Sequence, residues 1–101
     1  MLRRNFYVRG GEIDIIAEKG ELLVFVEVRA WDHRYWEGSS PAVTIRKSKM
    51  KRIVRAARYF MHANGINEYR RYIRFDVAAV IKTTGGFSME YYESAFQPEE
   101  Q

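Results

Sequence analysis

Leu22-Leu23-Val24-Phe25-Val26-Glu27-Val28 is apolar at six of its seven positions. A nearly continuous apolar run of this length is typical of a central β-strand that is covered on both faces. Glu27 places a charge inside this strand, and a charge in such a position is costly unless it has a partner. The segment therefore predicts both the middle of a sheet and a polar site beside it.

Two strands are expected before this segment and two after it. Upstream, Asn5 to Val8 and Glu12 to Ala17 are joined by a tight turn, because paired glycines accept positive φ at little cost. A second turn covers residues 18–21. Downstream, Tyr72 to Lys82 and Phe87 to Tyr92 flank another pair of glycines.

A loop from Asp32 to Pro41 and one helix are expected between the third and fourth strands. Thr44 is the predicted N-cap, and the helix ends near Ala63, before Asn64-Gly65. The predicted order is β-β-β-α-β-β, an α/β fold with a mixed sheet in one domain over residues 1–101. The long link lets the third and fourth strands lie parallel, with the helix as crossover.

The composition fits one small cytoplasmic domain. The chain has 101 residues, of which 47% are hydrophobic and 15% aromatic. It has no cysteine, so disulfides, thiolate catalysis and Cys-type zinc sites are excluded. No apolar run is long enough to span a membrane, and the first residues lack a signal-peptide pattern.

The charge is divided unevenly along the chain. Its net charge is +4, but residues 29–74 hold 12 basic and 3 acidic residues, a local charge of +9. The remainder holds 5 basic and 10 acidic residues. One region is therefore expected to attract polyanions, while another could hold a cation. The alternative is a solvated basic helix without a partner.

Three carboxylates are expected to meet on adjoining strands. Glu12 and Asp14 share one face of their strand under strict alternation, and Glu27 and Arg29 share one face of the next. One register places Glu12 opposite Glu27, and a shift by two places Asp14 there instead. Facing carboxylates repel, so the cluster calls for Mg²⁺ or Mn²⁺. The alternative is a salt-bridge network in which Arg29 alone pairs with the carboxylates.

These residues also match a family pattern. Arg4-Asn5, Gly11 to Ala17 and Val24 to Arg29 resemble the YraN-like family of uncharacterised bacterial proteins. The resemblance continues through Gly38, the segment Pro41 to Thr44, and Lys47. It ends with the segment Arg74-Phe75-Asp76-Val77. That family is considered similar to the restriction-endonuclease-like PD-(D/E)xK nucleases, and to archaeal Holliday-junction resolvases in particular.

The resemblance implies a metal-dependent endonuclease that acts on DNA, with branched or junction DNA as the expected substrate. By this resemblance Asp14 and Glu27 bind the metal, with the backbone carbonyl of Val28 as a further ligand. Glu12 is an accessory acid, and Arg29 stands where such nucleases carry lysine. Lys47 occupies the place of a supporting lysine or glutamine. Because arginine stays protonated, Arg29 is limited to electrostatic and positioning roles.

The chain departs from the family in two places. The family usually has a helix before the Arg4-Asn5 segment, and this chain begins without it. In the related resolvases that helix carries a catalytic glutamate. Its absence would leave one sheet face uncovered and suggests a homodimer. Trp31 stands where the family often has a basic residue.

Candidate DNA contacts lie on the helix and in the preceding loop. Their shared property is a positive charge or an aromatic ring. They are Lys47, Lys51, Arg55, Arg58, Arg34 and Trp36. The loop, Trp31 to Trp36, could equally form a dimer contact or cover the core. Asp76 is expected to orient a basic partner such as Arg74 or Arg29, with direct metal ligation as the alternative.

Three functions therefore remain open at this point. The first is a Mg²⁺- or Mn²⁺-dependent DNA endonuclease. The second is a non-catalytic nucleic-acid-binding module that retains the nuclease fold. The third is a structural or partner-binding protein whose acidic cluster is a salt-bridge network.

Overall fold

The computed structural model describes residues 2–32 and 45–98, which form one five-stranded sheet and one α-helix. The strands follow the chain order across the sheet. They are β1 (Leu2–Val8), β2 (Gly11–Lys19), β3 (Leu22–Asp32), β4 (Tyr72–Thr83) and β5 (Gly86–Phe96). The helix α1 (Lys47–Ala63) and a short 3₁₀ helix, η3 (Glu68–Arg70), separate β3 from β4.

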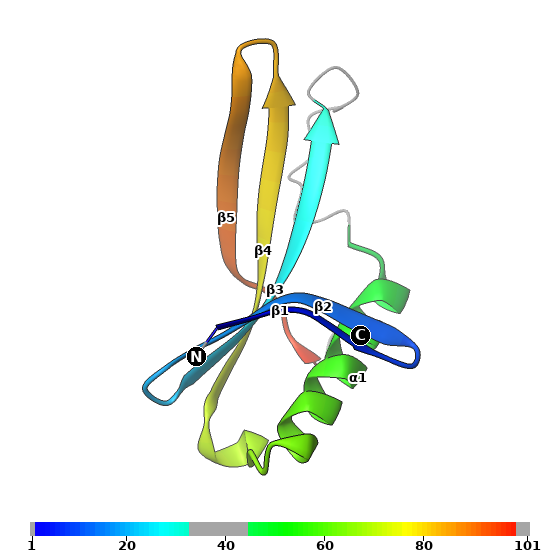
Figure 1. Ribbon diagram of the computed structural model, residues 1–101, viewed down its shortest axis with the longest axis vertical. Coiled ribbons are helices and arrows are strands. Elements are labelled where there is room, and N and C mark those ends of the chain that lie inside the picture. The colour runs from blue at the N-terminus through cyan, green and yellow to red at the C-terminus, as the bar shows by residue number, and fades with distance from the viewer. Residues whose placement is uncertain (1, 33–44, 99–101) are drawn as a thin grey trace.

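The predicted mixed sheet with one principal helix is confirmed. β3 is the central strand and pairs in parallel with β4, while the other neighbouring pairs are antiparallel. The long link that contains α1 makes this parallel pairing possible. Figure 1 shows α1 beside the lower part of the sheet, with β4, β5 and the end of β3 projecting upward as an arm.

The boundaries differ from the predicted ones mainly at strand ends. β1 begins earlier than expected, and β3 and β5 end later, because cross-strand hydrogen bonds extend pairing into segments without a clear hydrophobic pattern. The helix ends before Asn64 as predicted, but its N-cap is Arg46, which makes no side-chain capping hydrogen bond. The predicted N-cap, Thr44, lies outside the described residues.

The main core lies between the sheet and α1. The helix buries one apolar stripe, which consists of Ile53, Val54, Ala56, Ala57, Phe60 and Met61. Phe60 packs edge-on against Phe6 and Phe25, with ring centroids 5.3 and 6.1 Å apart. Burial of each large apolar side chain contributes about 1.5–3 kcal/mol, so this stripe holds the helix on the sheet.

A glycine brings the β1–β2 hairpin directly onto the helix. Gly10 has φ +86°, which the tight turn requires. A Cβ atom on Gly11 would come within 2.5 Å of the backbone oxygen of Arg52. Only glycine therefore permits this approach, which sets the position of the start of β2 relative to the first turns of α1.

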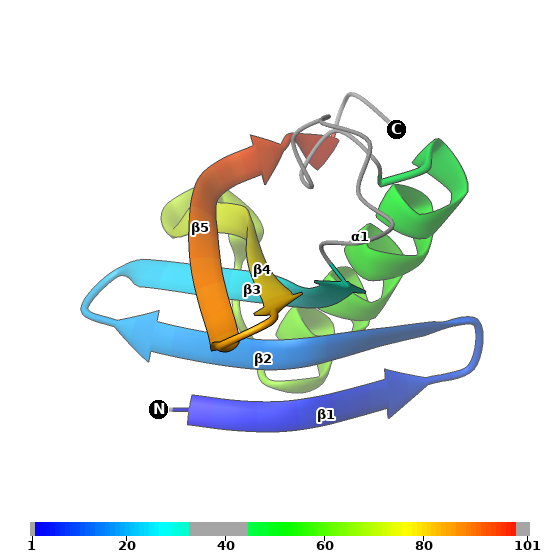
Figure 2. The same ribbon diagram turned by 90° about the horizontal axis from the view of Figure 1, so that it is seen from above.

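The second face of the sheet carries no helix among the described elements, as Figure 2 shows from above. A smaller apolar cluster of Val24, Val26 and Ala78 lies there. The strand β3 is therefore buried along its middle, and among the described elements a helix packs against one of its two faces. Within the described ranges, no helix has the length and apolar character needed to cross a membrane.

Candidate active site

The candidate site lies where β2 and β3 separate. Their pairing runs from Lys19 opposite Leu22 to Ile15 opposite Val26. Beyond that point β3 continues along β4, while β2 continues along β1. Figure 1 shows the β1–β2 hairpin and the upper part of β3 diverging from this fork.

Asp14 is the first residue of β2 beyond the paired region. Continuing the register by one position places it opposite Glu27, which is the second of the two registers considered from the sequence. Asp14 Oδ2 accepts a hydrogen bond from the backbone N–H of Val28 at 2.8 Å. The N–H and C=O of one strand residue point to the same edge. The Val28 carbonyl therefore also faces the edge where Asp14 lies.

The alternation of β2 breaks at this position. Ile13 and Ile16 both belong to the core on the helix side of the sheet. In a regular strand, residues that are three positions apart would point to opposite faces. In β1, Asn5 lies between the pairs that flank Asp14 and has φ +52°, which asparagine tolerates better than most residues. The strict alternation that was expected to place Glu12 and Asp14 on one face therefore does not hold along β2.

Glu27 is the most unusual carboxylate of the site. Its side chain is only 6% exposed, and Oε2 is buried with no hydrogen-bond partner among the described residues. Burial raises the pKa of Glu27, and the nearby charge of Asp14 raises it further. Lys49 and Arg29 act in the opposite direction because their positive charges favour the carboxylate.

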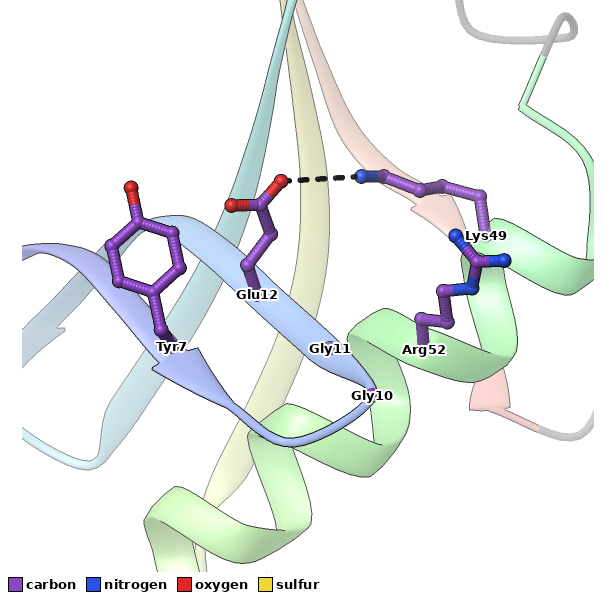
Figure 3. Close-up of a pocket in the computed structure, with 6 residues that line it drawn as sticks. All are labelled: Tyr7, Gly10, Gly11, Glu12, Lys49 and Arg52. Atoms are coloured by element: carbon purple, nitrogen blue, oxygen red, sulfur yellow. Dashed lines mark ion pairs between the residues drawn. The ribbon is translucent and has the colours of Figure 1, made fainter.

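Lys49, which is not among the predicted site residues, contacts the site. Lys49 Nζ lies 3.6 Å from Glu27 Oε1 and 3.9 Å from Glu12 Oε1. Figure 3 shows Lys49 extending from α1 toward Glu12 on β2. Both distances are too long for hydrogen bonds, so the two contacts are ion pairs. The helical period could have identified it, because Lys49 is four residues before the buried Ile53.

Lys47, the lysine that was predicted to support the site, is exposed at the first position of α1. Among the residues that the structure describes, Lys47 has no ion pair with a carboxylate. Lys47 and Lys49 are separated by about 200° around a helix, so the two side chains leave it in different directions. The helix lysine nearest the acidic residues is therefore Lys49.

The carboxylates do not gather as one cluster of three. Among residues 2–32 and 45–98, no group of three or more His, Cys, Asp or Glu side chains lies close enough to hold a metal ion. Glu12 is 47% exposed and shares Lys49 with Glu27. The expected cluster of three carboxylates is thus reduced to a pair, Asp14 and Glu27, at the strand fork. The ammonium group of Lys49 lies between Glu12 and Glu27.

Two hollows adjoin this network and share Lys49 and Arg52. One has a volume of about 410 Å³ and is also lined by Tyr7, Glu12 and the hairpin glycines. Figure 3 shows Tyr7 and Glu12 on the strand side of this hollow and the two cations on the helix side. The other, about 500 Å³, lies toward β3 and contains Glu27 and Arg29.

A family model provides the deciding comparison. The model of uncharacterised protein family UPF0102 matches residues 1–80. The chain belongs to this family. Membership confirms the resemblance to the YraN-like proteins.

Relatives in the UPF0102 family match most of the chain. A UPF0102 protein of Desulforapulum autotrophicum is 38% identical over 97 residues, which are 96% of this chain and 77% of that protein. One from Chromohalobacter salexigens is 39% identical over 92 residues, 91% of this chain and 71% of the relative. One from Aeromonas hydrophila is 46% identical over 76 residues, 75% of this chain. The chain spans only 57% of that last relative's length.

The predicted DNA-contact residues of this UPF0102 protein fall into three groups. Lys47, Lys51 and Arg55 are exposed on α1. Arg58 is exposed too, but its Nε lies 3.6 Å from Glu68 Oε2, so part of its charge is compensated. Arg34 and Trp36 lie outside the described residues.

Asp76 is a second buried carboxylate, and both of its oxygens accept hydrogen bonds. It is fully buried and accepts hydrogen bonds from Arg74 Nε at 3.0 Å and Nη2 at 2.9 Å. The Tyr91 hydroxyl donates to it at 2.6 Å, and the Ser94 N–H at 2.9 Å. Burial and this bond to Asp76 raise the pKa of Tyr91 to about 12. The expectation that Asp76 orients a basic partner is confirmed, and that partner is Arg74.

Proposed function

We propose that this UPF0102 protein is a metal-dependent endonuclease that hydrolyses phosphodiester bonds of DNA, with branched DNA as its substrate class. The observation that carries the proposal is the buried Glu27 Oε2 without a hydrogen-bond partner among the described residues, beside Asp14 at a strand fork. A buried carboxylate oxygen in that condition costs free energy, and a cation would compensate it.

The residues present fit a small hard cation. Asp14 and Glu27 offer carboxylate oxygens and Val28 offers a carbonyl on the same edge of β3. Oxygen ligands of this kind suit Mg²⁺ or Mn²⁺. When bound, such an ion supplies a water made nucleophilic and neutralises charge on the phosphate.

The chain's own cations would complete the chemistry. Lys49 and Arg29 lie beside Glu27, where their charge favours its ionised form. Arg29 stays protonated, so its contribution is to stabilise negative charge that develops on the phosphate. Lys49 reaches the site from the helix that also carries the exposed basic residues. The resemblance to PD-(D/E)xK nucleases supports the same assignment of Asp14, Glu27 and Arg29.

A cleavage assay tests the proposal. Four-way, flap and linear DNA are incubated with Mn²⁺ or EDTA and wild type, Asp14→Ala, Glu27→Gln or the matched control Glu21→Gln. Glu21 is an exposed carboxylate of the β2–β3 turn. We expect cleavage only with Mn²⁺, and only in wild type and Glu21→Gln. Cleavage that persists in EDTA or in Asp14→Ala would contradict the metal-dependent mechanism.

One observation favours a second function, a non-catalytic nucleic-acid-binding module with the same fold. Lys49 contacts both Glu12 and Glu27 and thereby supplies positive charge where a metal would otherwise do so. DNA binding without cleavage of any of the three substrates would support this alternative. Absence of salt-sensitive DNA binding would contradict both functions.

The homodimer stays a prediction, and the arm is the place to test it. Phe87 and Met89 of β5 are 75% and 65% exposed. We expect wild type to sediment as a dimer at micromolar concentration and Phe87→Ser with Met89→Ser to shift it toward the monomer. A wild type that is monomeric throughout would contradict the prediction.

A further inference from the structure

The hollow toward β3 has an unusual balance of charge. Its lining combines four cations with one carboxylate and one hydroxyl, in about 500 Å³. The lining residues are Arg29, Arg46, Lys49, Arg52, Glu27 and Ser48. Like charges repel when they gather in one place, so this arrangement calls for an anion in or over the hollow.

Not all four cations are already compensated by carboxylates. Lys49 pairs with Glu12 and Glu27, and Arg29 lies near enough to Glu27 to favour its ionised form. Within the part of the chain that the structure describes, neither Arg46 nor Arg52 has a carboxylate within ion-pair distance. Both side chains are exposed at the rim, where a ligand can reach them.

The start of α1 adds to the same field. Arg46 is the N-cap but makes no side-chain capping hydrogen bond, and the first turn contains no acidic residue. Free N–H groups and the positive end of the helix dipole attract anions at such a position. The Ser48 hydroxyl in this turn is a further donor beside the hollow. The helix end and the arginine side chains therefore act on the same space.

We propose that Arg46 and Arg52, with Ser48, form a phosphate subsite that holds a phosphodiester group of the nucleic-acid strand next to the Asp14–Glu27 pair. This inference rests on the proposed nucleic-acid function and adds where the strand is held. Guanidinium groups bind phosphate oxygens through paired N–H donors, which suits two arginines at the rim of one hollow. The strand then contacts the fork side of α1 in addition to the exposed face of Lys51 and Arg55.

Salt-dependent DNA binding tests the subsite without any need for cleavage. Fluorescence anisotropy in EDTA measures Kd for a labelled single strand and a duplex over a series of KCl concentrations. The variants are Arg46→Gln, Arg52→Gln and the double variant. Arg70→Gln is the matched control, because Arg70 is an exposed arginine of η3 outside the hollow.

We expect each substitution in the hollow to weaken binding by about tenfold and to reduce the slope of log Kd against log salt by about 1. Arg70→Gln should leave both quantities close to wild type. A double variant with the wild-type slope and affinity would overturn the subsite. Circular dichroism of each variant checks that a weaker Kd reflects a lost contact rather than unfolding.

Two further measurements distinguish the phosphate subsite from the nuclease proposal and from other anion binding. Asp14→Ala should abolish cleavage but bind DNA in EDTA at least as tightly as wild type, because it removes a negative charge beside the phosphate, so the nuclease proposal and the subsite can fail independently. Inorganic phosphate is compared with KCl at equal ionic strength as a competitor. Stronger displacement by phosphate that disappears in Arg52→Gln supports a site that recognises phosphate oxygens of the strand. Equal displacement by the two salts in wild type would overturn the subsite in favour of general charge attraction.

Discussion

Glu27 and Asp76 are two buried carboxylates on neighbouring strands of one sheet, and their surroundings differ completely. Val26 pairs with Asp76 and Glu27 pairs with Val77, so the two acids are one register position apart on β3 and β4. Asp76 has an arginine, a tyrosine hydroxyl and a backbone N–H as donors. Glu27 has one ion pair and one oxygen without a partner among the described residues.

The difference separates a structural carboxylate from a candidate functional one. A satisfied buried charge holds neighbouring segments together, and here Asp76 ties Arg74 of β4 to Tyr91 and Ser94 of β5. An incompletely satisfied charge reduces stability, which is typical of sites that await a ligand. Substitutions at the two acids should therefore have opposite effects on stability and on ligand binding.

The largest effect is expected for Asp76→Ala. This change removes the buried carboxylate that accepts hydrogen bonds from Arg74, the Tyr91 hydroxyl and the Ser94 N–H, so the free energy of unfolding should fall by about 3–5 kcal/mol. Urea denaturation measures it. Glu93→Ala is the matched control, because Glu93 pairs with the same arginine at 3.7 Å but is 67% exposed, and should cost at most about 1 kcal/mol. Equal losses would contradict the structural role of Asp76.

A smaller effect is expected when Mn²⁺ is added. At ten times its Kd, an ion that binds only the folded protein raises the free energy of unfolding by about 1.4 kcal/mol. Wild type and Glu21→Gln should show this gain in thermal and urea unfolding, whereas Asp14→Ala and Glu27→Gln should not. A gain that survives both of those substitutions would place the ion elsewhere.

Lys49→Met should sharpen the contrast by removing the ammonium group that contacts Glu12 and Glu27. Its positive charge opposes the binding of a second cation, so the variant should bind Mn²⁺ about tenfold more tightly by isothermal titration calorimetry. Lys47→Met, two residues away and exposed, is the control and should leave the affinity unchanged. Weaker binding in Lys49→Met would indicate that the lysine supports the ion site instead.

The smallest effect is expected in the pH dependence of metal-free stability. Burial raises the pKa of Glu27 above its ordinary value of 4.5, so the native state favours the protonated form. As the pH rises from 4.5 through the raised pKa of Glu27, the free energy of unfolding of wild type should fall relative to that of Glu27→Gln. Below pH 4.5 the free energies of unfolding of the two proteins should converge. Urea unfolding in EDTA over this window measures the difference. A wild type that gains on the variant as the pH rises would contradict the assigned shift.

Much of the fold was accessible from local pattern alone. The apolar run around Phe25, the glycine turns and the helical spacing of Ile53 and Phe60 predicted the order of elements and the parallel pairing. These features depend on side-chain alternation and turn chemistry, which neighbouring residues determine. The ends of β3 and β5 were missed because pairing with a neighbouring strand extended them.

The site was only partly accessible in the same way. The observed pairing of β2 with β3, continued by one position, places Asp14 opposite Glu27, which is one of the two predicted registers. Only registers that differ by two residues were possible, because a shift by one residue would turn the apolar side chains to the other face of the sheet. Lys49 is not among the predicted residues, although the helical period places it on the side of Ile53, four residues later. The period indicates which side of α1 faces the sheet, but not how closely the helix approaches the hairpin, which Gly11 permits because it has no side chain.

The sequence by itself therefore determined the mixed sheet, the central strand with its buried charge, the uneven distribution of charge and the family. Tertiary structure alone decided which partner each buried acid has. Asp76 and Glu27 both interrupt apolar strands, and no local pattern distinguishes them. Asp76 accepts hydrogen bonds from Tyr91 and Ser94 of the neighbouring strand β5, whereas Glu27 has an ion pair with Lys49 of α1 and one oxygen without a hydrogen-bond partner among the described residues. The physical reason is that an apolar run predicts burial of its strand, whereas the groups that compensate a charge in it come partly from other elements, β5 for Asp76 and α1 for Glu27.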